Sequence, residues 1–404
     1  MKSSAKEKYL KFKEINLYLF GLSFFSNFDL AKVFLGIMIG CLVIDIFYYK
    51  EKLECGNNKL RNFLIFLVLG GTIWNFCADF NYRAARAYLK INRYVIIVFY
   101  LYSLVKNNKI ILRNFIIFLT ISYITLIIRG INFYFIENRR DRFGNFEGIM
   151  DVAVLVAVIG AFCFGNIIKF KELKYKLLNG IILFFTIFLL IITQTRAALL
   201  AFIVGIIGIL IFNKNIKLIL ASCLLGSILV FGFLQTPYSA RFKSNTFNTK
   251  VTLSNMSNGL RIEMWKNAIW RFKQHPIMGS GTKQDKKLFD EYVYKNYGNS
   301  QIEKIYKNDL LTKFDDAHCM YLNSLTDNGL FTLFQFILIL GIIPLILLKN
   351  SKYIYGMSLF GGILAYDIFG VVWPLWRHGW DPMLLWLLIS LTCCSYLLEE
   401  DDDI

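Results

Sequence analysis

Residues 181–192 read IILFFTIFLLII, a run in which only Thr186 is polar. The run does not alternate apolar and polar residues, so it is not typical of a membrane β-strand. Similar runs of about 20 residues recur along the chain, and each is long enough to cross a hydrocarbon core of about 30 Å as a helix. The 404 residues are 56% hydrophobic and 17% aromatic. This composition excludes a water-soluble single domain and predicts an all-α polytopic membrane protein.

Hydropathy predicts about twelve transmembrane helices. They are expected at 15–28, 30–48, 62–79, 92–105, 112–135, 148–168, 177–194, 197–212, 217–235, 321–348, 353–373 and 382–398. The predicted organisation has three parts: helices 1 to 9 in residues 1–235, one large helical loop in 236–320, and helices 10 to 12 with an acidic tail in 321–404.

Lysines predict which side of the membrane each linker faces. The short linkers that carry them alternate as twelve spans require, and they lie at 2–13, 50–59, 106–109, 169–176, 214–217 and 349–352. By the positive-inside rule these linkers are cytoplasmic. Both termini are then inside, and the loop 236–320 is outside.

Arginines show the opposite distribution. Of the fourteen in the chain, only Arg61 and Arg113 map to the cytoplasmic side, and the other twelve map to outer linkers or outer helix ends. A guanidinium group suits the oxygens of phosphate or carboxylate better than an ammonium group does. The distribution therefore predicts an anionic, phosphorylated ligand on the outer side, although single arginines can also extend to lipid headgroups.

Two arginines lie in motifs that suit phosphate binding. Residues 193–201 read TQTRAALLA and place Arg196 between two spans, where it needs an aqueous cavity or an anionic partner. Residues 261–281 read RIEMWKNAIWRFKQHPIMGSG, with Arg261 in the first turn of a helix that Asn258 is predicted to cap. The expected apolar stripe of this helix is Ile262, Trp265, Ile269 and Phe272. The GSG at 279–281 is interpreted as a turn, because no strand precedes it.

His318 is the candidate base. It lies in DDAHCMYLNSLTDNGL (315–330), directly after the large loop and before a span. A neutral imidazole can accept a proton near neutral pH. The alternative is an interfacial histidine that only caps or packs. Asp315 and Asp316 can orient His318 or act as the base themselves, and capping of the next helix is favoured for one of them.

Further candidates lie in three other outer segments. RRDRFGNFE (139–147) contributes Arg142, NYRAARAY (81–88) contributes Arg83 and Arg86, and WPLWRHGWD (373–381) contributes Arg377 and His378 as secondary candidates. The tryptophans of the last segment are explained by an interfacial aromatic belt. The eight cysteines and three histidines form no recognisable disulfide framework or structural zinc site.

The order of TQTRAALLA, RIEMWKNAIW with HPIMGSG, and AHCMYLNSLTDNGL resembles the O-antigen ligase and O-antigen polymerase family of bacterial inner-membrane glycosyltransferases. The resemblance covers roughly residues 139–330. Thr195 stands where serine is common in the family, and Cys319 stands where asparagine often follows the histidine. The first exchange keeps a hydroxyl group, whereas the second removes an amide.

The resemblance implies transfer of a glycan from undecaprenyl pyrophosphate to a lipid A-core hydroxyl at the periplasmic face. No nucleotide sugar, cofactor or metal is expected, and His318 would be the catalytic base of an inverting displacement. The diphosphate would be bound by Arg196 and Arg261, with Arg142, Arg86 and Arg83 beside them. Alternatives are an O-antigen polymerase, a protein O-oligosaccharyltransferase, and a transporter or flippase of an anionic lipid-linked glycan.

Overall fold

The computed structural model describes residues 2–78, 81–139, 141–144, 148–213, 235, 256–284, 286–297, 301–313, 316–349, 355–377, 380–395 and 397. The first part of the chain forms α1 (Lys2–Phe24), α2 (Phe28–Phe47), α3 (Asn58–Cys77), α4 (Tyr82–Asn92), α5 (Ile96–Val105), α6 (Ile110–Ile131), α7 (Ile149–Lys169), α8 (Leu173–Thr193) and α9 (Arg196–Asn213). The second part forms α12 (Met256–Gln274), α13 (Lys286–Asn296), α14 (Gln301–Lys313), α15 (Met320–Asn328), α16 (Thr332–Phe336), α17 (Ile343–Lys349), α18 (Gly356–Gly370) and α19 (Asp381–Ser395).

Eleven of the twelve predicted spans coincide with a helix or with consecutive helices. The predicted span 217–235 lies outside the described residues, apart from Gln235. Among the described residues, eight helical segments are long and apolar enough to cross a membrane, and α18 and α19 are shorter apolar helices. The all-helical, multi-pass membrane class is therefore confirmed, whereas the number of twelve spans and the periplasmic loop stay predictions.

Asparagine side chains cap the N-termini of three helices. The Asn27 side chain accepts a hydrogen bond from the Leu30 backbone N–H at the start of α2. Asn57 and Asn81 do the same at the starts of α3 and α4. An asparagine before an apolar run satisfies backbone donors that the first helical turn leaves without partners. These caps fix where the chain enters each helix.

The first helix begins before the predicted span, and a buried ion pair links its charged half to α2. The Lys13 ammonium lies 2.6 Å from the Asp45 carboxylate of α2, and both side chains are buried. The Tyr9 hydroxyl donates to the same carboxylate over 2.9 Å. A charge at membrane depth is tolerated when it is paired in this way. Hydropathy alone does not show such pairing, so the predicted span began only at residue 15.

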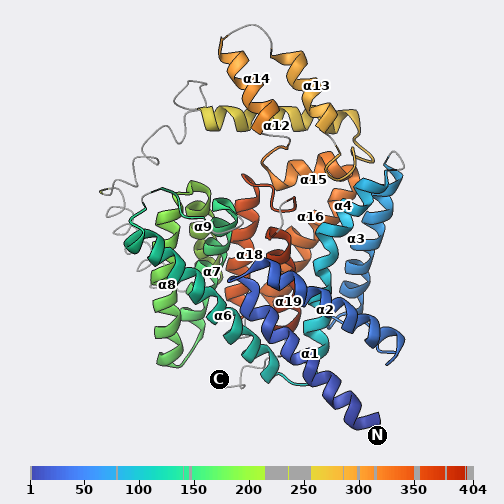
Figure 1. Ribbon diagram of the computed structural model, residues 1–404, viewed down its shortest axis with the longest axis vertical. Helices are drawn as coiled ribbons and strands as arrows, with labels where there is room; N and C mark the ends of the chain where they lie inside the picture. The colour runs from blue at the N-terminus through green and yellow to red at the C-terminus, as the bar shows by residue number, and fades with distance from the viewer. Residues whose placement is uncertain are drawn as a thin grey trace.

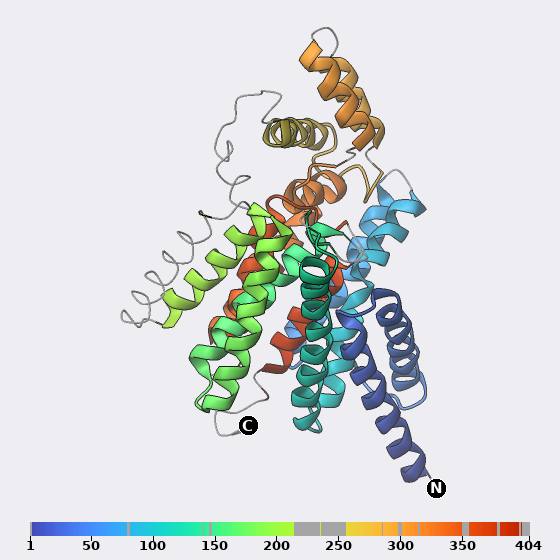
Figure 2. The ribbon, with the colours of Figure 1, turned by 60° about the vertical axis from the view of Figure 1, so that its left-hand side comes forward.

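The apolar helices form one bundle, and α12, α13 and α14 lie beyond one end of it (Figure 1). The N-terminus of α1 lies at the opposite end, as both views show (Figure 2). Large apolar side chains on the outside of the bundle are exposed, for example Ile128, Ile181 and Phe184. Such a surface is expected of helices that face lipid.

Close packing of glycines shows that α9 and α18 are antiparallel. A Cβ on Gly205 would meet Gly361 and Ala365, whereas a Cβ on Gly208, further along α9, would meet Phe360 and Leu364, earlier in α18. Small residues allow membrane helices to approach closely. The start of α9 is therefore at the same end of the bundle as the end of α18.

α12 lies between the bundle and the α13–α14 pair. Leu260 and Met264 pack against Phe289, Val293 and Leu310, which belong to α13 and α14. Ala268, one turn after Met264, packs against the segment that leads into α15.

Two predictions about α12 need correction. It ends at Gln274 as predicted but begins at Met256, so Asn258 lies inside its first turn and does not precede the helix. The predicted apolar stripe is not the most buried face, since Ile269 is 47% exposed while Met264, Ala268 and Arg271 are buried. The prediction failed because the buried face includes the polar side chains of Asn267 and Arg271, which an apolar pattern does not select.

Candidate functional site

A turn before α15 orients His318. Its backbone has a positive φ of 46°, an uncommon conformation for a residue with a Cβ. The Asp316 carboxylate accepts from the His318 backbone N–H over 2.6 Å and lies 2.7 Å from Nδ1 of the same residue. Asp316 is buried, and the side chain of His318 is 18% exposed. Both bonds use the same carboxylate oxygen, so the turn and the ring orientation are fixed together.

This geometry selects the form of the imidazole that can act as a base. A carboxylate at Nδ1 can only accept a hydrogen bond, so Nδ1 carries the proton and Nε2 becomes the basic nitrogen. The same carboxylate stabilises the imidazolium ion that forms after proton uptake. The Trp373 ring packs edge-on against the imidazole, with centroids 5.3 Å apart. Asp316 and His318 therefore form a histidine–carboxylate dyad.

The capping alternative would make Asp316 the N-cap of α15, but Asp316 does not occupy that position. Cys319 occupies the N-cap position, and its side chain makes no capping hydrogen bond. The Asn323 side chain instead accepts from the Ala317 backbone N–H over 2.8 Å. Burial raises the pKa of the Cys319 thiol, so this group stays protonated near neutral pH and does not compete as a nucleophile. Asp315, the other candidate cap, lies outside the described residues.

Arg142 is hydrogen-bonded to the turn that directly precedes Arg196. Its guanidinium donates to the Thr193 carbonyl oxygen over 3.1 Å and to the Thr195 hydroxyl over 2.9 Å. Gln194, between them, has a left-handed backbone with φ of 49°. The structure thus brings two of the predicted arginines to one turn, and the hydroxyl that Thr195 keeps is used to bind Arg142.

Three predicted regions lie at the same end of the bundle. Arg196 begins α9, at the end where α18 finishes, and the chain after α18 supplies Trp373 to the His318 ring. Ala268 of α12 packs against Ala317 and Cys319, the two neighbours of His318. Arg261 is half-buried two turns earlier on the same helix. These contacts bring the three regions near His318. None of the contacts named here joins Arg196 or Arg261 to His318.

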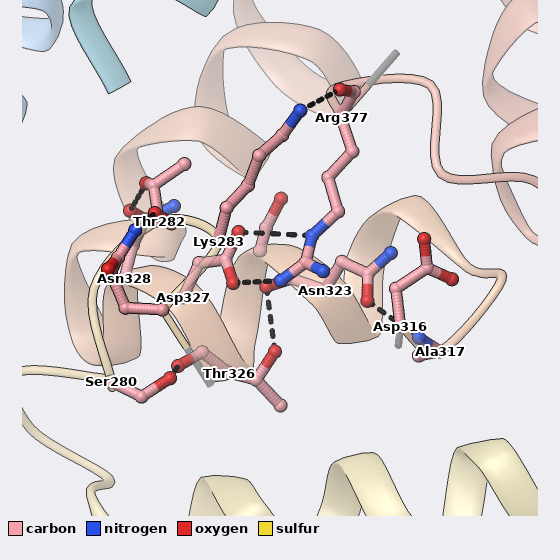
Figure 3. A network of polar contacts seen from close by, with 12 residues as sticks. Ser280, Thr282, Lys283, Asp316, Ala317, Asn323, Thr326, Asp327, Asn328 and Arg377 are labelled. Carbon is pink, nitrogen blue, oxygen red and sulfur yellow. Dashed lines mark hydrogen bonds and ion pairs between the residues drawn. The ribbon is translucent and has the colours of Figure 1, made fainter. Parts of the chain in front are cut away.

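Arg377 belongs to a buried ion pair and not to an open anion site. Its guanidinium forms two hydrogen bonds with the Asp327 carboxylate of α15, one of them from Nε over 3.3 Å. The Lys283 ammonium donates to the Arg377 carbonyl oxygen, and Figure 3 shows the Arg377 side chain reaching Asp327 while the Lys283 side chain reaches the Arg377 backbone. Arg377 and Asp327 are 7% and 5% exposed. This pair connects the turn after α18 to α15.

The GSG segment forms a turn, as predicted, and it packs against α15. The Ser280 and Gly281 backbone N–H groups donate to the Thr326 and Asp327 carbonyl oxygens, each over 2.9 Å. The Thr282 backbone N–H and hydroxyl both donate to the Asn75 side chain of α3 over 2.8 Å. The turn after α12 is therefore bound to both α15 and α3, which fixes the position of α12 over the dyad.

We expect Gly329→Ala to lower the melting temperature of the purified protein. Gly329 has φ of 54° and ψ of −134°, and a Cβ there would overlap the Ile277 carbonyl oxygen. Both effects oppose an L side chain. Gly341→Ala is the matched control, because a Cβ at Gly341 meets nothing within 4 Å. Equal melting temperatures for the two variants would contradict this explanation.

Arg83 and Arg86 are not brought to the dyad. Both are exposed on the first turns of α4. The Asn81 amide that caps this helix lies 3.4 Å from the Gln284 side chain, so the two arginines belong to the rim next to the turn after α12. His378 lies outside the described residues.

Sequence reasoning missed Asp327 and Arg271. Arg271 is 1% exposed on α12, its guanidinium lies 5.3 Å from the Phe289 ring centroid, and its charge acts on Asp327. The available signal was an aspartate within the apolar segment that starts with α15, because an ionisable residue in such a segment usually has a specific partner. The sequence does not show which distant cations provide that partner.

These features define a multi-pass membrane protein with a histidine–carboxylate dyad and two arginine-bearing segments at one end of its bundle. Residues 181–337 match a family model described as O-Antigen ligase. The matched region contains the turn before α9, α12 and the dyad, and it confirms the predicted resemblance to the O-antigen ligase and polymerase family. No curated protein matches the chain. The family match indicates an enzyme of the ligase or polymerase type that uses lipid-linked glycans.

Proposed function

We propose that the protein transfers a glycan from undecaprenyl pyrophosphate to a hydroxyl acceptor at the end of the bundle covered by α12. The observation that carries this proposal is the dyad, in which Asp316 accepts from Nδ1 of His318 over 2.7 Å. Its support is that this base lies within the region matched to the family, together with Arg196 and Arg261. The positive-inside pattern supports a periplasmic position for this end, and the family resemblance supports the inner membrane of a bacterium as the location.

In the proposed reaction His318 acts as the general base. Its Nε2 takes the proton of the acceptor hydroxyl while the hydroxyl oxygen attacks the anomeric carbon. The bond between that carbon and the diphosphate oxygen breaks, and undecaprenyl pyrophosphate leaves with the bonding electrons. A single displacement of this kind inverts the anomeric centre. Asp316 stabilises the imidazolium ion that results.

Arginines stabilise the leaving group in this proposal. Arg196 and Arg261 would donate to the diphosphate oxygens, whose negative charge grows as the glycosidic bond breaks. Arg142 acts on Arg196 by holding the turn, as its bonds to Thr193 and Thr195 indicate. Arg83 and Arg86, exposed on α4, would attract the anionic donor from the rim.

Arg261→Gln is expected to lower kcat/KM for the lipid-linked donor by about tenfold to 150-fold. This range corresponds to about 1.5–3 kcal/mol for a hydrogen bond to a charged group. Arg139→Gln is the matched control, because Arg139 lies on the surface in an exposed pair with Asp141. The control should change kcat/KM by less than about threefold. Equal losses in both variants would contradict a specific role for Arg261.

The proposed acceptor is lipid A-core, and a genetic experiment tests it. Deletion of a ligase leaves bare lipid A-core together with intact lipid-linked polymer. Deletion of an O-antigen polymerase instead leaves core that carries a single repeat unit, and loss of a protein O-oligosaccharyltransferase leaves unglycosylated protein. Either of the last two phenotypes would keep the proposed donor and chemistry but would contradict lipid A-core as the acceptor.

A further inference from the structure

A groove in the membrane part of the bundle lies away from the dyad. It has a volume of about 200 Å³ and is lined by α6, α7, α8 and α19. Its walls are apolar, and Ile117 of α6 and Leu178 of α8 lie at its edge. Both side chains are nearly half exposed on the lipid-facing surface, so the groove opens sideways between these two helices. An opening of this kind admits a lipid chain directly from the bilayer.

One end of the groove is cationic. Arg113 lines this end, is exposed, and donates to the Tyr175 hydroxyl over 3.4 Å. It lies in the first turn of α6, and Tyr175 lies in the first turn of α8. Neither first turn contains an acidic residue. The guanidinium and the first turns of two helices therefore lie at the same end of the groove, and all three favour an anion.

The surrounding linkers add to this positive charge. Residues 169–176 contain Lys169, Lys171, Lys174 and Lys176 against the single acid Glu172, which pairs with Lys174 over 2.8 Å. Two amide side chains also line the groove, and they bind each other between α7 and α8, since Asn166 donates to Asn179 over 3.0 Å. A ligand therefore finds polar partners at the mouth of the groove and apolar partners along its length.

We infer that this groove binds one anionic phospholipid from the leaflet at the end of the bundle where α1 begins. An acyl chain would lie between α6 and α8, and the phosphate would lie against Arg113 and the first turns of both helices. A basic pocket between membrane helices is the arrangement that selects anionic headgroups. The site is separate from the proposed diphosphate site, because Arg113 lies at the start of α6 and α6 ends at Ile131 near the opposite end of the bundle.

Native mass spectrometry of the purified full-length protein tests the inference. The protein is mixed with phosphatidylglycerol and phosphatidylethanolamine of identical acyl chains at equal concentration. One phosphatidylglycerol should remain bound per chain, in preference to phosphatidylethanolamine. This comparison uses only the wild-type protein. Equal occupancy by the two lipids would contradict the inference. Displacement of phosphatidylglycerol by an equal concentration of undecaprenyl phosphate would also overturn it, because the groove would then bind the prenyl chain.

Two variants locate the site. Arg113→Ala should weaken phosphatidylglycerol binding about fivefold, the effect of one cation near an anionic headgroup. Arg61→Ala is the matched control, since Arg61 is the fourth residue of α3 as Arg113 is of α6, and Arg61 does not line the groove. Leu178→Trp should block the opening and remove bound lipid of either kind. Equal loss in the two arginine variants, or full binding in Leu178→Trp, would contradict the assignment.

Discussion

Replacing His318 with alanine is expected to lower the rate of glycan transfer by about 10²- to 10⁴-fold. This is the usual contribution of a positioned general base. The affinity for the lipid-linked donor should change little, because the proposed diphosphate contacts come from Arg196 and Arg261. Single-turnover transfer by the purified protein, combined with a direct donor-binding measurement, separates the two quantities.

The structure supplies a matched control for this substitution. His275 is exposed just beyond the end of α12 and belongs to no part of the dyad. His275→Ala should therefore transfer glycan at nearly the wild-type rate. Asp316→Asn should lower the transfer rate as well, because an amide at position 316 no longer fixes the proton on Nδ1 or stabilises the imidazolium ion. A wild-type rate in His318→Ala would show that another group takes the proton.

The second large effect is expected on stability. Arg377→Leu should destabilise the protein by about 3–5 kcal/mol, because it leaves the Asp327 carboxylate buried without its main partner. The charge of Arg271 and the backbone N–H of Lys283, which also act on Asp327, would reduce this loss toward the lower end. Thermal unfolding of the purified protein in detergent measures the effect.

A double-mutant cycle tests whether the loss comes from this pair. Arg377→Leu combined with Asp327→Leu removes both charges and should be more stable than Arg377→Leu alone. The exposed pair of Arg139 and Asp141 is the control, and Arg139→Gln should change stability by no more than about 1 kcal/mol. Strictly additive effects of the two leucine substitutions would show that the buried pair is not coupled.

Hydropathy and motif order predicted the helices that span the bundle and the regions that meet at one end. The prediction succeeded because each apolar run must form a helix in lipid, whatever its neighbours are. His318, Arg142 and Arg196 could be chosen as candidates from the sequence, because a charged or titratable side chain at a span boundary stands out against apolar residues. The orientation of His318 by Asp316 was left open beside capping, since that choice depends on one backbone turn.

Other features depend on pairings that no local pattern contains. Lys13 with Asp45 and Arg377 with Asp327 join residues 32 and 50 positions apart, and each pair makes a charge acceptable where hydropathy argues against it. The buried face of α12 differed from the predicted stripe for a similar reason, because it packs on α13 and α14 and includes the buried Arg271. Local periodicity of apolar residues cannot anticipate a buried arginine.

The most direct test is transfer by purified protein in lipid vesicles, without nucleotide, added metal or membrane potential. The substrates are an undecaprenyl pyrophosphate-linked glycan and lipid A-core on the same side of the vesicle membrane. Wild type should join the glycan to the core and release one undecaprenyl pyrophosphate for each glycan transferred, and folded His318→Ala should not. If wild type instead moves the lipid-linked glycan across the membrane and leaves its glycosidic bond intact, the protein is a transporter and the proposed chemistry is wrong.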